Sequence, residues 1–126
     1  MIQNLIANAL DAIGHGGRLR IRITGAHERR NGSPGVRVTV GDSGSGISPE
    51  IRNMLFEPFV STRENTGTGL GLWVSAEIVR RHGGTIRVKS RLRPPFTGTV
   101  FSVFLPAPVG GRHRTPCAMT DARACY

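Results

Sequence analysis

Hydrophobic residues recur every three or four positions along residues 2–13, which is the spacing of a helix with one buried face. Asn4, Asn8 and Asp11 fall on the opposite, polar side of this helix. Gly14 follows at once, with two more glycines close behind, and predicts that the helix ends there. The hydrophobic side consists of Ile2, Leu5, Ile6, Ala9, Leu10 and Ile13.

Two segments, 19–23 and 36–40, alternate hydrophobic and polar residues, which predicts half-buried strands. Residues 31–35 have the composition of a turn, so the two strands are expected to form a hairpin. Ser48 followed by Pro49 is typical of a helix start and predicts a short helix over about 49–55.

The second half of the chain repeats the change from helix to strands. Leu72, Ala76 and Val79 mark one face of a helix expected from about 70 to 82. Strands are expected around 86–88 and 101–105. The periodicity ends at Pro106, so we expect one domain over 1–106 and a disordered tail over 107–126.

The composition narrows the class of protein. A length of 126 residues suits a single domain. No apolar run approaches the roughly eighteen residues of a membrane span, and no signal peptide opens the chain. Cys117 and Cys125 both lie in the tail, and we interpret them as reduced thiols of a cytoplasmic protein. We therefore expect no membrane contact from this segment.

The formal net charge is +9, and Arg supplies nearly all of the basic residues. This charge fits either a nucleic-acid surface or attraction for a polyphosphate or an acidic partner. The Arg residues are spread along the chain, without the interleaved aromatic residues of a base-stacking surface. A solvated, Arg-rich surface is the simplest interpretation.

Three short segments carry candidate chemistry. Asn4 and Asn8 are one helical turn apart, so their amide oxygens can reach the same Mg²⁺ ion or phosphate group, although polar helix faces are often merely solvated. Asp42 follows a strand and precedes two glycines, so its carboxylate can accept a hydrogen bond from an exocyclic amine, or simply form a turn.

The third segment is a Gly-rich loop over 67–71 that leads into a helix, an arrangement whose backbone amides can bind phosphate. A flexible connector would have the same composition. Before it, Phe56 and Phe59 are expected to anchor the base of a mobile loop on the core. Thr62 and Arg63 lie in that loop, where a guanidinium could reach a terminal phosphate or remain solvated.

In this order, the segments resemble the ATP-binding catalytic domain of sensor histidine kinases, within the wider GHKL class that includes DNA gyrase B, heat-shock chaperones and MutL. The resemblance covers residues 2–106 and implies an α/β (α+β) two-layer sandwich of the Bergerat type, with a mixed sheet and helices on one face. The matching segments are NLIANALDA, GDSGSGI, LFEPFVSTR, GTGLGLWVSAEIVRRHGGTI and GTVFSVFLP.

The resemblance also implies roles for individual residues. Asn8 would ligand Mg²⁺ with help from Asn4, Asp42 would bind the adenine amine, and Arg63 would be the cation of the lid. Thr99 would lie beside the adenine water network. The adenine would be lined by Gly44, Gly46 and Ile47, the phosphates would be held by Gly67, Gly69, Leu70, Gly71 and Leu72, and the remaining ATP-binding residues would be Asp11, Phe59, Thr62 and Thr68.

Asn4 also indicates the type of reaction. ATPases of the wider class carry a Glu at this position as general base, and an amide cannot take that proton. The resemblance therefore implies transfer of the γ-phosphoryl group of ATP rather than its hydrolysis. None of the four His residues lies in the H-[ED]-x-x-x-P context of a phosphoacceptor helix. The acceptor is expected to be a His on a separate dimerisation domain, normally of the same polypeptide, with a response regulator downstream.

The chain begins inside its first helix, and the family places a strand and a helix before that point. We therefore expect an upstream portion to be missing and the sheet to have about four strands and an uncovered side. Two other functions stay open. One is a non-catalytic ATP-binding or regulatory fragment of such a kinase, and the other, suggested by charge alone, is a basic nucleic-acid-binding module.

Overall fold

The computed structural model describes residues 1–28, 32–60 and 69–108. The predicted lid residues Thr62, Arg63, Gly67 and Thr68 lie outside the described residues, as does the tail from 109 onward. The predicted elements are all present and extend slightly beyond or short of the expected bounds. They are α1 (Ile2–Ile13), β1 (Leu19–His27), β2 (Pro34–Asp42), α2 (Pro49–Met54), α3 (Gly71–Arg81), β3 (Thr85–Arg91) and β4 (Gly98–Pro106).

The strands form a four-stranded sheet in the order β1-β2-β4-β3. The number of strands agrees with the expectation, but the expected mixed sheet is wrong, because every pair in the described sheet is antiparallel. The crossover through α2 and α3 returns β3 in the same direction as β2. β4 then lies between these two strands, so they form no parallel pair.

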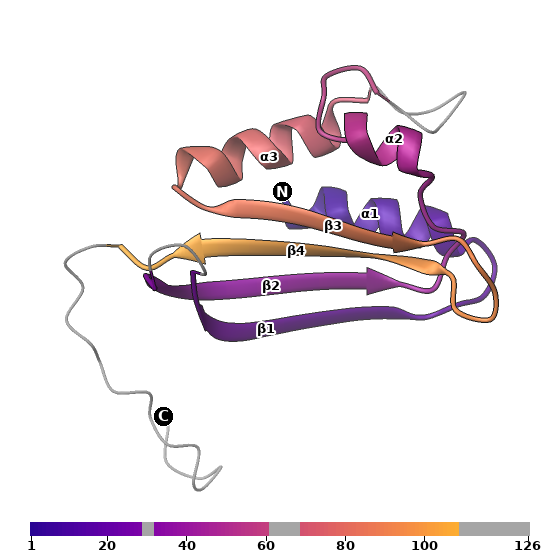
Figure 1. The fold of residues 1–126 in the computed structure, drawn as a ribbon, viewed down its shortest axis with the longest axis horizontal. Helices are drawn as coiled ribbons and strands as arrows, with labels where there is room; N and C mark the ends of the chain where they lie inside the picture. Colours follow the sequence, from indigo (N-terminus) through magenta and orange to yellow (C-terminus); the bar gives the residue numbers. More distant parts are fainter. Residues whose placement is uncertain (29–31, 61–68, 109–126) are drawn as a thin grey trace, which may run out of the picture.

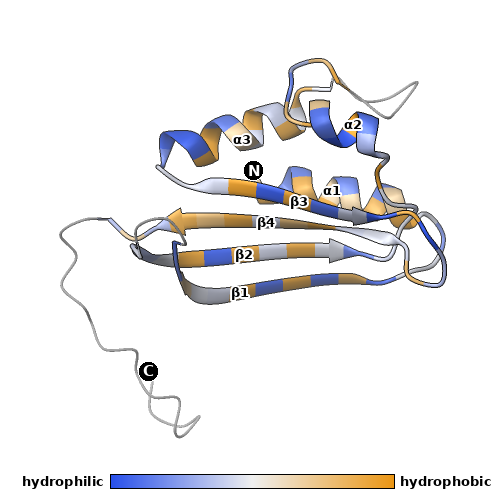
Figure 2. Cartoon of the chain, in the orientation of Figure 1, coloured by the Kyte–Doolittle hydropathy of each residue, from blue (hydrophilic) through white to orange (hydrophobic). Residues whose placement is uncertain are grey.

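The molecule has two layers, with α1, α2 and α3 on one face of the sheet (Figure 1). Hydrophobic and polar residues alternate along much of the strands (Figure 2). Because successive side chains of a strand point to opposite faces, one set faces the helices and the other faces away from them. The core between the layers combines residues of α1, β2, β4 and α3 with Leu55. Its buried members are Leu5, Ala9, Val38, Val40, Leu55, Val79, Phe101 and Val103.

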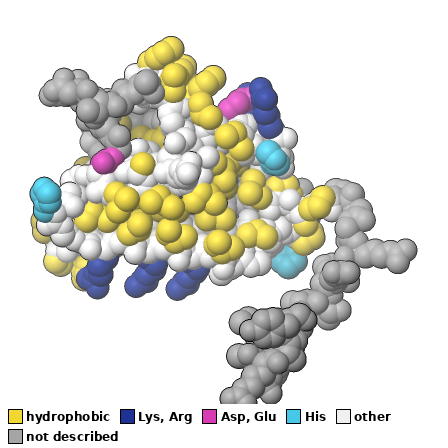
Figure 3. Space-filling view, turned by 180° about the vertical axis from the view of Figure 1, so that it is seen from behind, with side chains coloured by type: hydrophobic (Ala, Val, Ile, Leu, Met, Phe, Trp, Pro, Cys, Tyr) yellow, Lys and Arg dark blue, Asp and Glu magenta, His cyan; other side chains and the backbone are white. Residues whose placement is uncertain are grey.

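The helices do not cover the whole inner face of the sheet. Ile21 and Ile23 pair with Val40 and Val38 and therefore point to the helix side, yet they are 46% and 65% exposed. Leu10 of α1 is 54% exposed as well. Figure 3 shows that hydrophobic side chains are exposed over much of the molecule seen from behind. Within the described residues, the inner face of the sheet is therefore only partly covered at β1.

The helix ends have the expected chemistry. Gly14 follows α1 with a positive φ of 60°, a conformation that glycine adopts without steric cost. Ser48 caps α2 and accepts a hydrogen bond from the Ile51 N–H. Backbone hydrogen bonding and the Ser48 hydroxyl lower the pKa of the Glu50 carboxyl in the first turn. Among the described helices, none has the length and apolar character needed to cross a membrane.

Candidate functional site

The polar face of α1 contacts the start of α3 through Asn4. The Asn4 amide Nδ2 donates to the Gly71 carbonyl oxygen at 3.0 Å and lies 3.4 Å from the Ser75 hydroxyl. Ser75 is fully buried, and its hydroxyl donates to the same Gly71 carbonyl at 2.7 Å. The structure therefore brings together two of the predicted segments, which are 67 positions apart in sequence.

The ends of the loop that precedes α3 also meet. A Cβ added to Gly69 would lie 2.6 Å from the Phe59 carbonyl carbon, so only a glycine fits against this backbone. Phe56 packs on the core as expected. Phe59 does not, because it has a positive φ of 67° and its side chain is 78% exposed. The expected anchoring role is wrong for Phe59: its ring is exposed, and its backbone packs against Gly69.

Asp42 lies at the end of β2 and organises the turn that follows. Its Oδ1 accepts hydrogen bonds from the Gly44 N–H at 2.9 Å and from the Thr99 N–H of β4 at 3.2 Å. Both of these bonds use the same carboxylate oxygen. Thr99 is 2% exposed, so this carboxylate is held at the junction of two central strands rather than in a free turn.

Gly44 lets the Asp42 turn pack directly against α1. A Cβ at this position would lie 2.4 Å from the Ala12 carbonyl oxygen. The first helix thus meets the α3 start at Asn4 and the Asp42 turn at Ala12. These positions are separated by roughly 12 Å along the helix axis, at 1.5 Å per residue. The polar side of α1 between them, which carries Asn8, is flanked at each end by a predicted ligand-binding segment.

Gly46 and Ile47 lie next to β3. The Ile47 N–H donates to the Ser90 hydroxyl at 2.7 Å, and that hydroxyl is 3.2 Å from the Thr99 hydroxyl. Gly46 has a φ of 81°, and a Cβ there would lie 2.4 Å from the Arg91 carbonyl oxygen. The structure therefore joins the predicted adenine residues into one hydrogen-bonded group around Asp42, Ser90 and Thr99.

The remaining predicted residues divide into side-chain and backbone candidates. Asn8 is half-buried and Asp11 is exposed, both on the polar side of α1. Leu72 packs its side chain against the core, so only its backbone is suited to contact a ligand. Leu70 stands at the N-cap of α3 and makes no side-chain hydrogen bond there. The first amides of α3 are therefore not capped by that side chain.

Sequence reasoning missed Ser75 and Ser90. Each is a hydroxyl at a position where the periodicity calls for a hydrophobic residue: Ser75 follows Leu72 at helical spacing, and Ser90 continues the inward series of Ile86 and Val88. A buried polar group needs a hydrogen-bond partner. A serine inside a hydrophobic series was thus the available signal.

The oxygen chemistry of α1 fits a hard cation such as Mg²⁺. The Asn4 amide nitrogen is directed to Gly71 and Ser75, which leaves its oxygen as the amide atom available to a ligand. Within the described residues there is no group of three His, Cys, Asp or Glu side chains that could hold a metal. Mg²⁺ in nucleotide sites needs few protein ligands, because waters and phosphate oxygens fill most of its coordination positions. Two neutral amide oxygens are compatible with that requirement.

Two hollows of the described surface lie elsewhere. One of about 420 Å³ follows the β3–β4 loop and includes Ile47 and Ser90. Another of about 290 Å³ lies on the sheet face opposite the helices. Neither is lined by Asn4, Asp42 or Gly71. The predicted lid comprises residues 57–70, and its central part, 61–68, is outside the described part.

Among curated proteins, the chain is similar to the sensor histidine kinase ZraS of Salmonella typhimurium, with 39% identity over 106 residues. The match covers 84% of this chain and 21% of ZraS, so the chain spans about a fifth of that relative's length.

Among solved structures, the chain is similar to the mycobacterial sensor histidine kinase MprB, with a TM-score of 0.69 and 32% identity over 83% of this chain and 68% of that one. It also matches full-length ShkA in complex with AMPPNP, with a TM-score of 0.63 and 28% identity, covering 84% of this chain and 21% of ShkA. Residues 1–109 match the model of the histidine kinase-, DNA gyrase B- and HSP90-like ATPase family, and the chain belongs to this family.

Proposed function

We propose that the chain binds Mg²⁺-ATP along the polar side of α1 and transfers the γ-phosphoryl group to a histidine on a separate domain. The observation that supports this proposal is that two predicted ligand-binding segments pack against α1. Asn4 contacts Gly71 at the start of α3, and Gly44 of the Asp42 turn packs against Ala12. A nucleotide with its base at Asp42 and its phosphates at Gly69–Gly71 would extend along the helix between these two contacts.

The base would bind at the Asp42 end. A carboxylate whose Oδ1 is already held by two backbone amides has a fixed orientation, and its other oxygen can accept the exocyclic amine of adenine. The Ser90 and Thr99 hydroxyls, 3.2 Å apart, add adjacent polar groups that can hold a water molecule. The flat surface would come from Gly44, Gly46 and Ile47.

The phosphates would bind at the α3 end. Backbone amides at the start of a helix favour anions, because they are unpaired and stand at the positive end of the helix dipole. α1 lies beside this end, since a Cβ added to Gly71 would make an ordinary contact of 3.4 Å with the Asn4 Cγ. Asn8 and Asn4 would supply oxygen ligands to Mg²⁺, which when bound neutralises phosphate charge.

Transfer rather than hydrolysis follows from the chemistry of Asn4. An amide cannot act as general base for an attacking water, and here its nitrogen is occupied by Gly71. Catalysis would then consist of positioning and charge neutralisation, with Arg63, Thr62, Gly67 and Thr68 as predicted contributors from the undescribed loop. We propose a phosphoacceptor His domain, a response regulator downstream and a cytoplasmic location.

Calorimetric titration of ATP tests the adenine end. Asp42→Asn keeps an oxygen that can accept from Gly44 and Thr99 but removes the charge that strengthens the bond to the adenine amine. We expect ATP affinity to fall by about tenfold or more, with a smaller loss of stability than Asp42→Ala causes. Glu77→Gln is the control, because it removes one negative charge at the far end of α3. Equal ATP affinity for wild type and both Asp42 variants would refute this assignment.

The same titration with EDTA tests the metal. ATP affinity should fall when Mg²⁺ is removed from the wild-type chain. In Asn8→Ala, the affinities with and without Mg²⁺ should be nearly the same. If the wild-type chain binds ATP equally well with and without Mg²⁺, the proposed role of Asn8 is wrong.

Radiolabelled ATP tests the transfer. The chain should label the dimerisation domain of a similar sensor kinase on histidine, and it should release phosphate far more slowly than typical enzymes turn over, which is about 1–10³ per second. ATP binding without labelling would favour the alternative of a non-catalytic ATP-binding fragment. Rapid phosphate release in the absence of an acceptor would contradict the argument from Asn4.

A further inference from the structure

The sheet face opposite the helices is strongly cationic, and its charges follow a pattern. On this face the outer strands β1 and β3 carry long basic side chains, and the central strands carry Thr39, Val100 and Ser102, with Arg37 and the buried Phe104 at one end. One cross-strand row reads Arg22, Thr39, Ser102, Arg87 from β1 to β3. Together the rows form a cationic trough with basic walls and a hydroxyl-bearing floor. We define it by Arg20, Arg22, Arg37, Thr39, Ser102, Arg87, Lys89 and Arg91.

The basic side chains of the trough have no carboxylate partners among the described residues. The ion pairs of the described structure join Glu77 to Arg80 and Arg81 on α3, in the helical layer. Glu28 is the one acidic residue that lines the hollow on this face. A concentration of unpaired positive charge on one face raises the local potential and attracts an anion.

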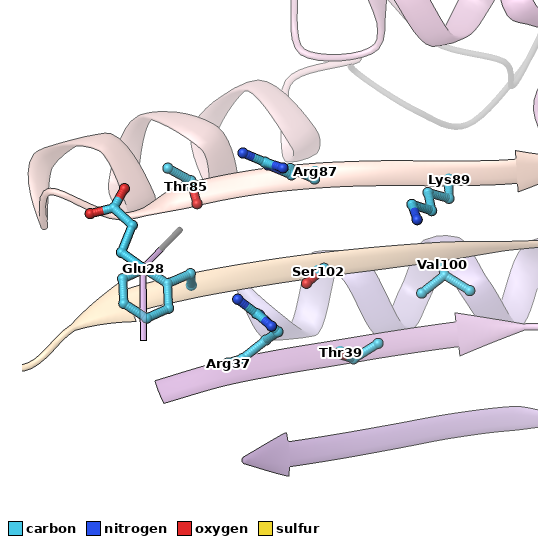
Figure 4. Close-up of a pocket in the computed structure, with 9 residues that line it drawn as sticks. Glu28, Arg37, Thr39, Thr85, Arg87, Lys89, Val100 and Ser102 are labelled. Atoms are coloured by element: carbon cyan, nitrogen blue, oxygen red, sulfur yellow. The ribbon is translucent and has the colours of Figure 1, made fainter. Parts of the chain in front are cut away.

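Part of the trough is a hollow that has Glu28 in its lining. A depression of about 290 Å³ is lined there by residues from β2, β4 and β3. Figure 4 shows Arg37, Arg87 and Lys89 around it, with Thr39 and Ser102 between them. Cations and hydroxyl groups thus border the same space, which is the donor set that binds carboxylate or phosphate oxygens.

We propose that the cationic trough binds an extended acidic segment of a partner protein. β1 and β3 are three strand spacings apart, or about 14 Å at about 4.8 Å each. This leaves width for one extended chain over Thr39, Val100 and Ser102, with Arg37 as a further cation at one end of the floor. Its carboxylates would alternate between the two walls, where a guanidinium accommodates both carboxylate oxygens. The hydroxyls of Thr39 and Ser102 would bond its backbone.

The face lacks what a single-stranded nucleic acid would use. Bases bind such surfaces by stacking on exposed aromatic rings, and the aromatic residue on this face of the described sheet, Phe104, is 3% exposed. The exposed aromatic residues Phe59, Trp73 and Phe96 belong to other segments. This absence of stacking groups on the described face favours an acidic peptide over a nucleic acid.

The trough and the proposed nucleotide site lie on opposite faces of the sheet, because α1 and α3 cover the other side (Figure 1). Binding of an acidic segment should therefore persist in saturating Mg²⁺-ATP. Failure of the nucleotide proposal would leave this binding unchanged, so the two proposals can be tested separately.

Fluorescence anisotropy with a labelled oligoglutamate tests the proposal on the full chain. We expect binding that weakens as salt is added and no binding of an uncharged oligoglutamine. Arg22→Glu and Arg87→Glu, one on each wall, should each reduce affinity by about tenfold. Arg81→Glu on α3 makes the same charge change in the helical layer, where Arg81 pairs with Glu77, and should leave affinity within about twofold. Circular dichroism checks that each variant is folded.

Three results would overturn the proposal. The first is a lack of oligoglutamate binding by the folded wild-type chain. The second is an equal loss of affinity in Arg81→Glu and the trough variants, which would indicate attraction to net charge alone. The third is binding of labelled oligothymidylate as tight as that of oligoglutamate, which would assign the face to nucleic acid.

Discussion

At the scale of single residues, close backbone contacts decide where the site segments lie. Gly44 is buried against α1, and a Cβ there would lie 2.4 and 2.5 Å from the Ala12 carbonyl oxygen and carbon. These are backbone atoms of a helix and cannot move aside without disturbing it. At Gly71 the corresponding nearest atom is the Asn4 Cγ at 3.4 Å, an ordinary contact with a side chain.

The two glycines should therefore differ in their tolerance of a methyl group. Gly44→Ala should lower the free energy of unfolding by about 1–3 kcal/mol, because the contact with Ala12 is overpacked. Gly71→Ala should change it by less than about 1 kcal/mol, since alanine is the better helix former. Urea denaturation followed by circular dichroism measures both. Equal losses for the two variants would show that Gly44 does not hold the turn against α1.

At the scale of elements, α1 contributes to the core and to the site through different sides. Leu5 is fully buried and Ala9 nearly so, while Asn4 and Asn8 lie on the polar side. Leu10, which the periodicity assigns to the hydrophobic side, is 54% exposed because the helices leave this part of β1 uncovered. The hydrophobic face predicted for α1 is therefore buried only in part.

Replacing Leu5 and Leu10 one at a time distinguishes the buried part of the hydrophobic face of α1 from its exposed part. Leu5→Ala should cost about 2–5 kcal/mol, the range for a buried leucine that leaves a cavity. Leu10→Ala should cost less than about 1 kcal/mol, because much of its surface is already in water. Thermal and urea unfolding of the pair measure the difference. A large loss in Leu10→Ala would mean that another part of the chain covers this residue.

At the scale of the whole molecule, the two faces of the sheet present different surfaces. The face away from the helices is cationic. The helix face ends in an uncovered hydrophobic surface at β1 and the start of β2, where Ile21, Ile23 and Val36 are between 43% and 65% exposed. Exposed hydrophobic surface of this kind promotes association, and an unpaired edge strand adds open backbone groups.

Reducing the hydrophobic surface should therefore reduce self-association. Ile23→Thr keeps a β-branched residue in the strand and should change stability by less than about 0.5 kcal/mol. Sedimentation velocity at increasing protein concentration should show less association than for wild type. Val40→Thr is unsuitable as a solubility variant. Val40 is fully buried, so the hydroxyl of the introduced threonine would lose its contact with water. Unchanged association of Ile23→Thr would exclude this surface as its cause.

The helices and strands were predictable because their signals are local. Ile2–Ile13 forms the expected helix, and Gly71–Arg81 differs from the expected 70–82 by one residue at each end. The family also followed from the order of the motifs. The antiparallel sheet did not follow, since the insertion of β4 between β2 and β3 depends on contacts between strands that are distant in sequence.

For the site, the sequence indicated which residue types carry the chemistry, and their roles in ligand binding stay predictions. It did not reveal Ser75 and Ser90, whose hydroxyls are placed by the packing of α3 and β3. It also assigned the Phe59 ring to the core, whereas Phe59 has a positive φ and is 78% exposed.

The sequence by itself determined the elements, the family and the candidate residues, because periodicity, turn chemistry and short motifs are properties of neighbouring positions. Only the tertiary structure decided which neighbours these residues acquired. Packing of α1 against both the Asp42 turn and the start of α3 brought the candidate site together. Strand alternation gathered basic residues from β1, β2 and β3 on the opposite face, because side chains far apart in sequence become neighbours when their strands pair in register.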